Sequence, residues 1–134
     1  MEKPGVLSLW LGNSPTEDEL KQYVELKFNK LGDRISSKFM QDFKIDLVDY
    51  NQDLLERTFI NHSTKSLKVL LKGSSYEDKI LPQLIEHYGE TIEGNFNSVI
   101  RLYDFEYNEV VDEVKSANKN IVFMGAVTYE EWDE

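Results

Sequence analysis

The uninterrupted stretch SVIRLYDFEY, at Ser98–Tyr107, most constrains what this chain can fold into. Branched and aromatic side chains dominate it and neither Gly nor Pro breaks it, which is typical of a β-strand. Because side chains alternate along a strand, one face would carry Val99, Arg101, Tyr103, Phe105 and Tyr107. The other face would carry Ile100, Leu102, Asp104 and Glu106. Both faces begin with apolar residues, so we predict a central strand covered on both sides, at least in its first half.

Three further segments are predicted to complete a sheet of about four strands. Val6–Gly12 alternates, with three leucines on one face. Ser66–Lys72 also alternates, which predicts a strand with a partly basic outer face. Asn120–Tyr129 carries branched and aromatic residues on one face and predicts a last strand. The segments Asn61–Lys65 and Glu90–Asn97 are predicted to be loops.

The sequence after the first predicted strand favours a helix. Ser14-Pro15-Thr16-Glu17 predicts its start, with Ser14 as N-cap, Pro15 at the first helical position and Glu17 completing a capping box. Apolar residues follow at helical spacing and would pack on the sheet: Leu20, Tyr23, Val24, Phe28 and Leu31. Gly32-Asp33 would end this helix or its extension.

Two more helices are predicted later in the chain. Ser37–Phe43 predicts a short one, and Ser75–Tyr88 carries a long apolar stripe that Gly89 would end. Pro82 indicates that the regular part of this second helix begins near Asp78 or is kinked.

Two segments fit more than one structure. Ile45–Ile60 fits a helix or a strand, and we favour helix for part of it. Glu109–Asn120 fits a helix or an irregular hairpin arm. No repeat or linker divides the chain, so residues 1–134 are predicted to form one α+β domain. We expect a mostly antiparallel sheet of about four strands with two to three helices packed on one face.

Composition excludes several classes of site and location. The chain has no cysteine, which excludes disulfides, zinc–thiolate sites and thiol nucleophiles. The apolar run at the N-terminus is short and Ser8 interrupts it, so we do not expect a signal peptide. No segment approaches the ~20 apolar residues of a membrane span. We therefore expect a cytoplasmic protein that does not enter a membrane.

Negative charge is concentrated late in the chain. Residues 1–74 hold 11 acidic and 11 basic side chains, whereas residues 75–134 hold 14 acidic and 4 basic ones, which gives the full net charge of −10. Such a surface repels nucleic acid, because phosphate binding depends on Lys and Arg. It attracts basic proteins and accelerates their encounter. Acidic residues that serve only solubility are the simpler interpretation.

A contact face for a basic protein can be assigned from this pattern. Its acidic members would be Asp104, Glu106, Glu109, Asp112, Glu113, Glu130 and Glu131. Tyr107 and Trp10 are candidate anchors, since aromatic rings supply buried area while carboxylates pair with Lys or Arg. For Trp10, packing under another element is the simpler interpretation.

Metal binding is not supported by the spacing of the candidate ligands. Asp49–Asp53 has the D-x-N-x-D spacing that opens a calcium loop, but Leu54 occupies the glycine position and Ile60 that of the bidentate glutamate. His62 and His87 lie far apart and in no metal-binding arrangement. We expect no metal and no cofactor.

Two alternatives to a contact face for a basic protein stay open. Asp104 and Glu106 stand two residues apart on a predicted strand and could form the acid/base pair of a small hydrolase, if a cleft held both. A general protein-interaction module is the other alternative.

Strand and turn signatures of one family occur along nearly the whole chain: VLSLWLGN at Val6–Asn13, TEDEL at Thr16–Leu20 followed by Tyr23, SKFMQDFKID at Ser37–Asp46, VIRLYDFEY at Val99–Tyr107 and FMGAVTYE at Phe123–Glu130. Together they resemble the Immunity protein 22 family of bacterial polymorphic toxin systems. The sequence departs from the family pattern at Lys44, where a glycine is expected, and at Leu47, where an aromatic residue is expected. The resemblance implies an α+β cytoplasmic protein that neutralises a cognate toxin, and it carries over no contact residues. Our leading hypothesis is therefore an immunity protein that covers a basic toxin, for which a nuclease fits, through the acidic face.

Overall fold

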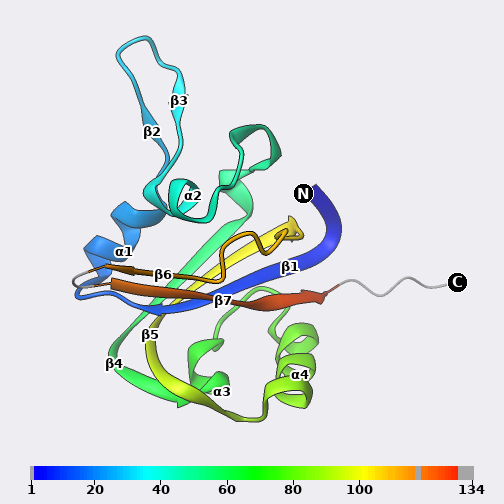
Figure 1. Cartoon of the computed structure of the whole chain (residues 1–134). Coiled ribbons are helices and arrows are strands. Elements are labelled where there is room, and N and C mark those ends of the chain that lie inside the picture. Colours follow the sequence, from blue (N-terminus) through cyan, green and yellow to red (C-terminus); the bar gives the residue numbers. More distant parts are fainter. Residues whose placement is uncertain (1, 117–118, 130–134) are drawn as a thin grey trace, which may run out of the picture.

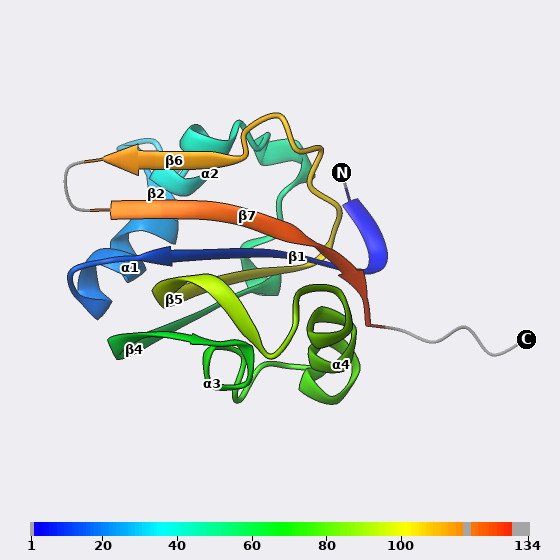
Figure 2. The same cartoon turned by 60° about the horizontal axis from the view of Figure 1, so that its bottom comes forward.

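A five-stranded antiparallel sheet forms the centre of the computed structural model, which describes residues 2–116 and 119–129. The strand order is β4-β5-β1-β7-β6, as Figure 2 shows. The bounds are β1 Glu2–Asn13, β4 Leu55–Ser66, β5 Thr91–Phe105, β6 Glu113–Ser116 and β7 Lys119–Thr128. The predicted central strand, β5, is an interior strand, and β1 beside it is the middle of the sheet.

Helices cover both faces of this sheet (Figure 1). One layer holds α1 and α2, and the other holds α3 and α4. Their bounds are α1 Glu17–Val24, α2 Lys38–Phe43, α3 Leu67–Leu70 and α4 Glu77–Tyr88. A hairpin of β2 Lys27–Phe28 and β3 Arg34–Ile35 projects from the body. The α+β class is confirmed, but the described sheet has five strands rather than about four, and the helices occupy two faces rather than one. None of the helices in the described part of the chain has the length and apolar content that crossing a bilayer requires.

Side chains of β1 point alternately into the two helical layers and contribute to the core of each. Trp10 packs against Phe39 and Phe43 of α2, whereas Leu9 and Leu11 belong to the cluster that contains the leucines of α3 and α4. All five side chains are fully or almost fully buried. Burying a side chain of this size contributes about 1.5–3 kcal/mol, so both layers stabilise the same strand. The predicted strand Val6–Gly12 is therefore confirmed and lies inside β1.

The face assignment for β5 holds only in its first part. Val99 and Tyr103 face the α3–α4 layer as one set, but Phe105 and Tyr107 lie in the α1–α2 cluster instead of with them. The cause is Asp104, whose φ of 56° is left-handed and interrupts the two-residue alternation. The sequence pattern shows no sign of this switch, since aspartate also fits a regular strand position.

The first predicted helix is wrong at both ends. Thr16, not Ser14, is the N-cap of α1, and its hydroxyl accepts a 3.1 Å hydrogen bond from the Glu19 N–H group. Ser14 is buried before the helix. The helix ends at Val24 because Glu25 already has an extended backbone, with φ −78° and ψ 128°.

The residues predicted to extend that helix form the β2–β3 hairpin. Its tip is a turn in which the Asn29 side chain accepts hydrogen bonds from the N–H groups of Leu31, at 2.9 Å, and Asp33, at 3.0 Å. Gly32 takes a φ of +85°, which glycine adopts without strain. Phe28 and Leu31 were predicted to pack on the sheet, but they are 64% and 87% exposed. The Asn and Gly turn chemistry therefore prevails over the helical spacing of two apolar residues.

The predicted strand Ser66–Lys72 is wrong. β4 ends at Ser66, whose hydroxyl accepts a hydrogen bond from the Val69 N–H group and caps α3. Leu67, Leu70 and Leu71 are fully buried, at helical spacing, whereas Val69 is 45% exposed. The run LKVLL fits both periods, and the helical one places three leucines instead of two in the core.

The two ambiguous segments and the two predicted loops contain more strand than expected. The favoured helix in Ile45–Ile60 is present only as two 3₁₀ turns, η1 Leu47–Asp49 and η2 Gln52–Leu54, before β4 begins. Asn61–Lys65 continues β4, and most of Glu90–Asn97 belongs to β5. The described part of Glu109–Asn120 supplies β6, so the hairpin alternative holds there. In contrast, α2 and α4 form as predicted, with α4 starting at Glu77 and keeping Pro82 inside it.

Candidate functional site

The loop of residues 106–112, which we call the acidic loop, joins β5 to β6. Exposed carboxylates lie on it or directly after it: Glu106, Glu109, Asp112 and Glu113. Lys3 lies 3.2 Å from the first of them, and Lys115 lies 3.7 Å from the last. Four of the predicted acidic residues are therefore brought together on one connection. Glu130 and Glu131 lie outside the described residues.

Asp104 differs from these four, because it is used inside the molecule. Its Oδ1 accepts a 2.9 Å hydrogen bond from the Gly5 N–H group and another from the Tyr129 hydroxyl. Tyr129 in turn donates its N–H group to the Gly5 carbonyl oxygen at 2.9 Å. Asp104 thus joins the start of β1 to the end of β7, and its carboxylate is not free for a partner.

Tyr107 fixes the acidic loop to the core. Its hydroxyl donates to the Phe43 carbonyl oxygen at 2.6 Å and accepts from the Val111 N–H group at 3.0 Å. Its own N–H group donates to Ser8 Oγ at 3.0 Å. Burial, together with the nearby Asp112 carboxylate and against the Val111 hydrogen bond, raises the pKa of the Tyr107 hydroxyl, which therefore stays protonated and donates. The loop is held at its far end by Asp112, whose carbonyl oxygen accepts from the Phe123 N–H group at 2.8 Å.

Neither aromatic residue predicted as an anchor reaches the surface. Trp10 is fully buried, and its ring centroid lies 4.9 Å from that of Phe39, 5.4 Å from that of Tyr107 and 5.2 Å from that of Phe123. Tyr107 is 3% exposed. In this conformation both residues support the sheet and the acidic loop from inside and do not offer a contact to a partner.

Sequence reasoning missed a buried polar network around Arg101, which is 3% exposed. Its guanidinium donates to Ser74 Oγ at 2.6 Å and to Thr58 Oγ1 at 2.7 Å, and its Nε lies 3.4 Å from Glu56 Oε1. Glu56 also accepts from the Tyr103 hydroxyl at 3.0 Å. The only signal in the sequence is a single cation within an otherwise apolar part of the strand.

The ionisation of this network is set by burial and by its internal contacts. Burial would raise the pKa of Glu56, but hydrogen bonds from Ser75 and Tyr103 and the charge of Arg101 hold it below its ordinary value. Burial lowers the pKa of Arg101, and Glu56 opposes that shift. Burial and the Glu56 carboxylate raise the pKa of Tyr103. The Glu56 carboxyl is therefore ionised at neutral pH and the Tyr103 phenol is neutral, so the phenol can donate to the carboxylate.

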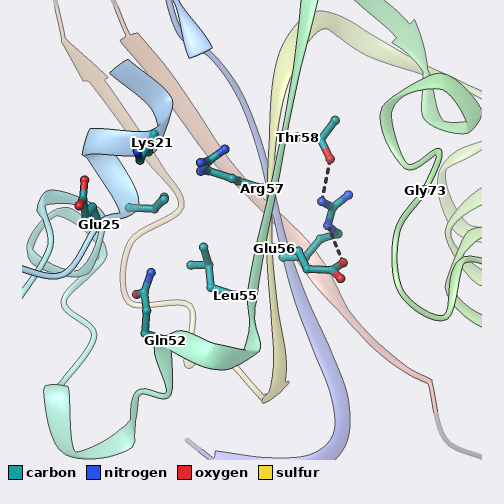
Figure 3. Close-up of a pocket in the computed structure, with 10 residues that line it drawn as sticks. Lys21, Glu25, Gln52, Leu55, Glu56, Arg57, Thr58 and Gly73 are labelled. Atoms are coloured by element: carbon teal, nitrogen blue, oxygen red, sulfur yellow. Dashed lines mark hydrogen bonds and ion pairs between the residues drawn. The ribbon is translucent and has the colours of Figure 1, made fainter. Parts of the chain in front are cut away.

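A polar groove of about 550 Å³ lies along β4, the edge strand next to this network. Figure 3 shows Lys21, Leu55 and Arg57 on one side of the strand and Glu56 and Thr58 on the other. Two carboxylates line the groove, Glu25 and Glu56, and Glu56 is committed to Arg101. A second, smaller hollow of about 210 Å³ lies between α1, α2 and β6–β7. It is lined by Tyr23, Lys38, Asp42, Val114, Lys115, Ser116, Lys119 and Ile121.

These positions do not support the hydrolase alternative. An acid/base pair needs both carboxylates in one cleft. Asp104 is engaged by Gly5 and Tyr129, and Glu106 is half-exposed beside Lys3. Neither of the two carboxylates lines either hollow.

A family relationship covers nearly the whole chain. The family model described as Immunity protein 22 matches residues 7–130, which is nearly the whole chain. The chain belongs to the Immunity protein 22 family. No curated protein and no solved structure matches it. Membership in the Immunity protein 22 family implies toxin neutralisation, and immunity proteins are generally non-catalytic. The predicted family and its coarse function are therefore confirmed.

The structure gives a reason for the glycine expected at position 44 in the Immunity protein 22 pattern, where this chain has Lys44. Lys44 is the residue after α2 and has φ 56° and ψ 46°, which is the left-handed conformation that closes many helices. Its N–H group donates to the Gln41 carbonyl oxygen at 3.4 Å. Glycine adopts this conformation without the steric penalty of a Cβ atom, so the glycine expected there has a structural reason.

Proposed function

We propose that this Immunity protein 22 member neutralises a cognate toxin in the cytoplasm by covering a cationic surface of the toxin with its acidic loop. The observation that carries the proposal is the grouping of Glu106, Glu109, Asp112 and Glu113 on one exposed connection. Membership in the family supplies the toxin as partner. A nuclease fits the charge, because an enzyme that binds nucleic acid presents Lys and Arg to phosphates.

Electrostatics supports this surface over a general solubility role. The C-terminal part of the chain, residues 75–134, carries the whole net charge of −10. A field of this kind steers a basic partner and raises its association rate. In the acidic loop, Glu109 and Asp112 are exposed, which leaves their carboxylates available to Lys or Arg.

The way the acidic loop is held favours binding as well. Tyr107 fixes its beginning through Phe43, and the backbone of Asp112 fixes its end through Phe123. A segment that is already ordered loses little conformational entropy when it binds. The carboxylates therefore act as a preformed surface, and inhibition follows from steric cover of the toxin and charge complementarity.

The test is binding to the toxin domain that the neighbouring gene encodes, in a catalytically inactive form. We expect the Glu109→Lys/Asp112→Lys double variant to lower the association rate by about tenfold at low salt, and the difference to shrink at physiological salt. The matched control is Glu86→Lys/Glu93→Lys, which changes the net charge equally at exposed positions on α4 and β5. Equal effects of the two pairs, or none, would show that the acidic loop is not the contact surface.

A further inference from the structure

The β2–β3 hairpin is the part of the described chain that is exposed along its whole length. Every residue from Lys27 to Ile35 is exposed, and Figure 1 shows the hairpin extending away from the layers. Three of these residues are large and apolar: Phe28 at 64%, Leu31 at 87% and Ile35 at 41% exposure. Apolar side chains grouped in this way on a soluble protein mark an interaction site more often than scattered ones do.

The hairpin is ordered rather than a loose loop. Asn29 organises its tip through two backbone N–H groups, and the Asn29 N–H group donates to the Asp33 carbonyl oxygen at 3.0 Å. The base is fixed on both sides, by Leu26, which packs against the α1–α2 cluster, and by buried Ser37, which caps α2. The exposed side chains are thus presented on a preformed support.

The register places an apolar residue and a cation on each face of the hairpin. Phe28 pairs with Arg34, and Lys27 pairs with Ile35. Directly opposed residues of an antiparallel pair point to the same side, so one face carries the first pair and the other face the second. Leu31 lies at the tip between them. A two-sided projection of this kind fits a cleft that contacts both faces, and a flat surface would leave one face in water.

Charge indicates the chemistry of that cleft. The hairpin holds Lys27, Lys30 and Arg34 against the single carboxylate of Asp33, within a chain whose net charge is −10. Cations that flank apolar side chains are complementary to apolar walls bordered by carboxylates.

The position of α2 connects this hairpin to the acidic loop. The hairpin leads directly into the N-cap of α2 at Ser37, and Tyr107 of the acidic loop bonds to Phe43 at the other end of the same helix. Six helical residues span about 9 Å. The two elements therefore lie in the same layer of the molecule and one partner can reach both.

We propose that the β2–β3 hairpin inserts into a carboxylate-bordered, apolar-walled cleft of the cognate toxin, while the acidic loop contacts a cationic surface beside that cleft. This inference rests on the proposed function and assigns it a second contact of opposite charge. A nuclease that holds catalytic carboxylates within a cationic surround would supply both charges.

The experiment compares full-length variants for binding to the inactive toxin domain from the neighbouring gene by calorimetry. Phe28→Ser/Leu31→Ser is expected to weaken binding by roughly 30-fold or more, as loss of a central apolar contact does. The control, Val69→Ser, removes an exposed apolar side chain from α3 on the opposite face of the sheet and should leave affinity unchanged. Unchanged melting temperature and near-ultraviolet circular dichroism confirm that each variant is folded.

A second pair of variants tests the charge. Lys27→Glu/Arg34→Glu is expected to weaken binding by about tenfold, whereas Lys65→Glu/Lys72→Glu, at exposed positions away from the hairpin, should not. Equal losses in the two pairs would overturn the assignment of carboxylates to the cleft.

The outcomes separate the two proposals. If the wild-type chain does not bind the toxin domain, both fail. If it binds and Phe28→Ser/Leu31→Ser binds equally well while Glu109→Lys/Asp112→Lys does not, the hairpin inference alone fails. If sedimentation shows a wild-type dimer that the Phe28→Ser/Leu31→Ser variant loses, the hairpin serves contact between copies and the inference is again overturned.

Discussion

Arg101 in β5 and Glu109 in the acidic loop that follows β5 carry charges with opposite uses in this protein. Arg101, within β5, is buried and has its guanidinium bonded to Ser74 and Thr58. Glu109, in the acidic loop that follows, is exposed. A charge that is buried must be paired, since desolvation penalises the isolated ion, whereas an exposed one adds little to stability. The comparison teaches that the charged residues of this chain divide into buried ones that hold the fold together and exposed ones that are available to a partner.

The largest effect on the free energy of unfolding is expected from breaking the buried polar network around Arg101. Arg101→Ala removes the partner of Glu56 and leaves the hydroxyls of Ser74 and Thr58 unpaired, so the free energy of unfolding should fall by about 3–5 kcal/mol. Urea unfolding followed by Trp10 fluorescence measures it. A loss below about 1 kcal/mol would show that the network contributes little beyond a surface ion pair.

Asp104→Ala is expected to have the next largest effect. The variant leaves the Gly5 N–H group and the Tyr129 hydroxyl without their acceptor, and alanine is less tolerant than aspartate of the φ of 56°. We expect a loss of about 1–3 kcal/mol. Asp104→Asn is the control, since an amide oxygen can still accept and asparagine tolerates this conformation. If the two variants are equally stable, Asp104 does not have the internal role assigned to it.

The lowered pKa of Glu56 predicts how the stability of the protein changes with pH. Its pKa is lower in the folded chain than its ordinary value of 4.5, so its contribution is complete above that value and is lost as the pH falls through the folded pKa. Glu56→Gln should therefore reduce the decline in stability on acidification below about pH 5. The effect is expected to be smaller than that of Arg101→Ala because the Glu56 side chain is 33% exposed. Urea titrations at a series of pH values provide the measurement, and parallel curves for the two proteins would contradict it.

Replacement of Lys44 by glycine is expected to stabilise the protein, because Lys44 has a left-handed backbone conformation. Lys44→Gly relieves the left-handed conformation at the end of α2, and the gain exceeds the added entropy of the unfolded chain by about 0.5–1 kcal/mol. The readout is the midpoint of thermal unfolding, which should rise. Lys44→Ala, which keeps a Cβ atom, should not reproduce the rise.

The smallest effect on stability is expected in the acidic loop itself. Glu109→Ala/Asp112→Ala should change the free energy of unfolding by less than about 0.5 kcal/mol per site, as exposed substitutions do. The same variant should bind the toxin domain more slowly. A large loss of stability would remove the distinction between structural and recognition charges on which the comparison rests.

Local sequence signals were sufficient where they agreed with one another. The alternation of Val6–Gly12, the helical spacing of Phe39 and Phe43 in Ser37–Phe43, and the apolar stripe of Ser75–Tyr88 each predict the observed element. The late concentration of negative charge predicts a contact face, which stays a prediction; four of its acidic residues lie on the acidic loop or directly after it. In these segments the period of the apolar residues by itself indicates the observed structure.

Long-range contacts explain most of what sequence reasoning could not give. Nothing near Arg101 in the sequence reveals Ser74 or Glu56 as its partners, and nothing near Asp104 reveals Gly5. Phe28 satisfies helical spacing whether or not a core exists to receive it. The placement of helices on both faces depends on how far β1 is buried, which a pattern of alternation does not measure.

The position of β4 at the edge of the sheet has a consequence for aggregation. A long strand with an unpaired edge invites the edge of another molecule, and this is a common route to aggregation. β4 extends over 12 residues at that edge, whereas β6 at the opposite edge has only 4. Lys21, Glu25 and Arg57 line the hollow beside β4, and such ionic groups must be dehydrated before a second sheet can add there. The same side chains therefore disfavour pairing of β4 with the edge of a second molecule.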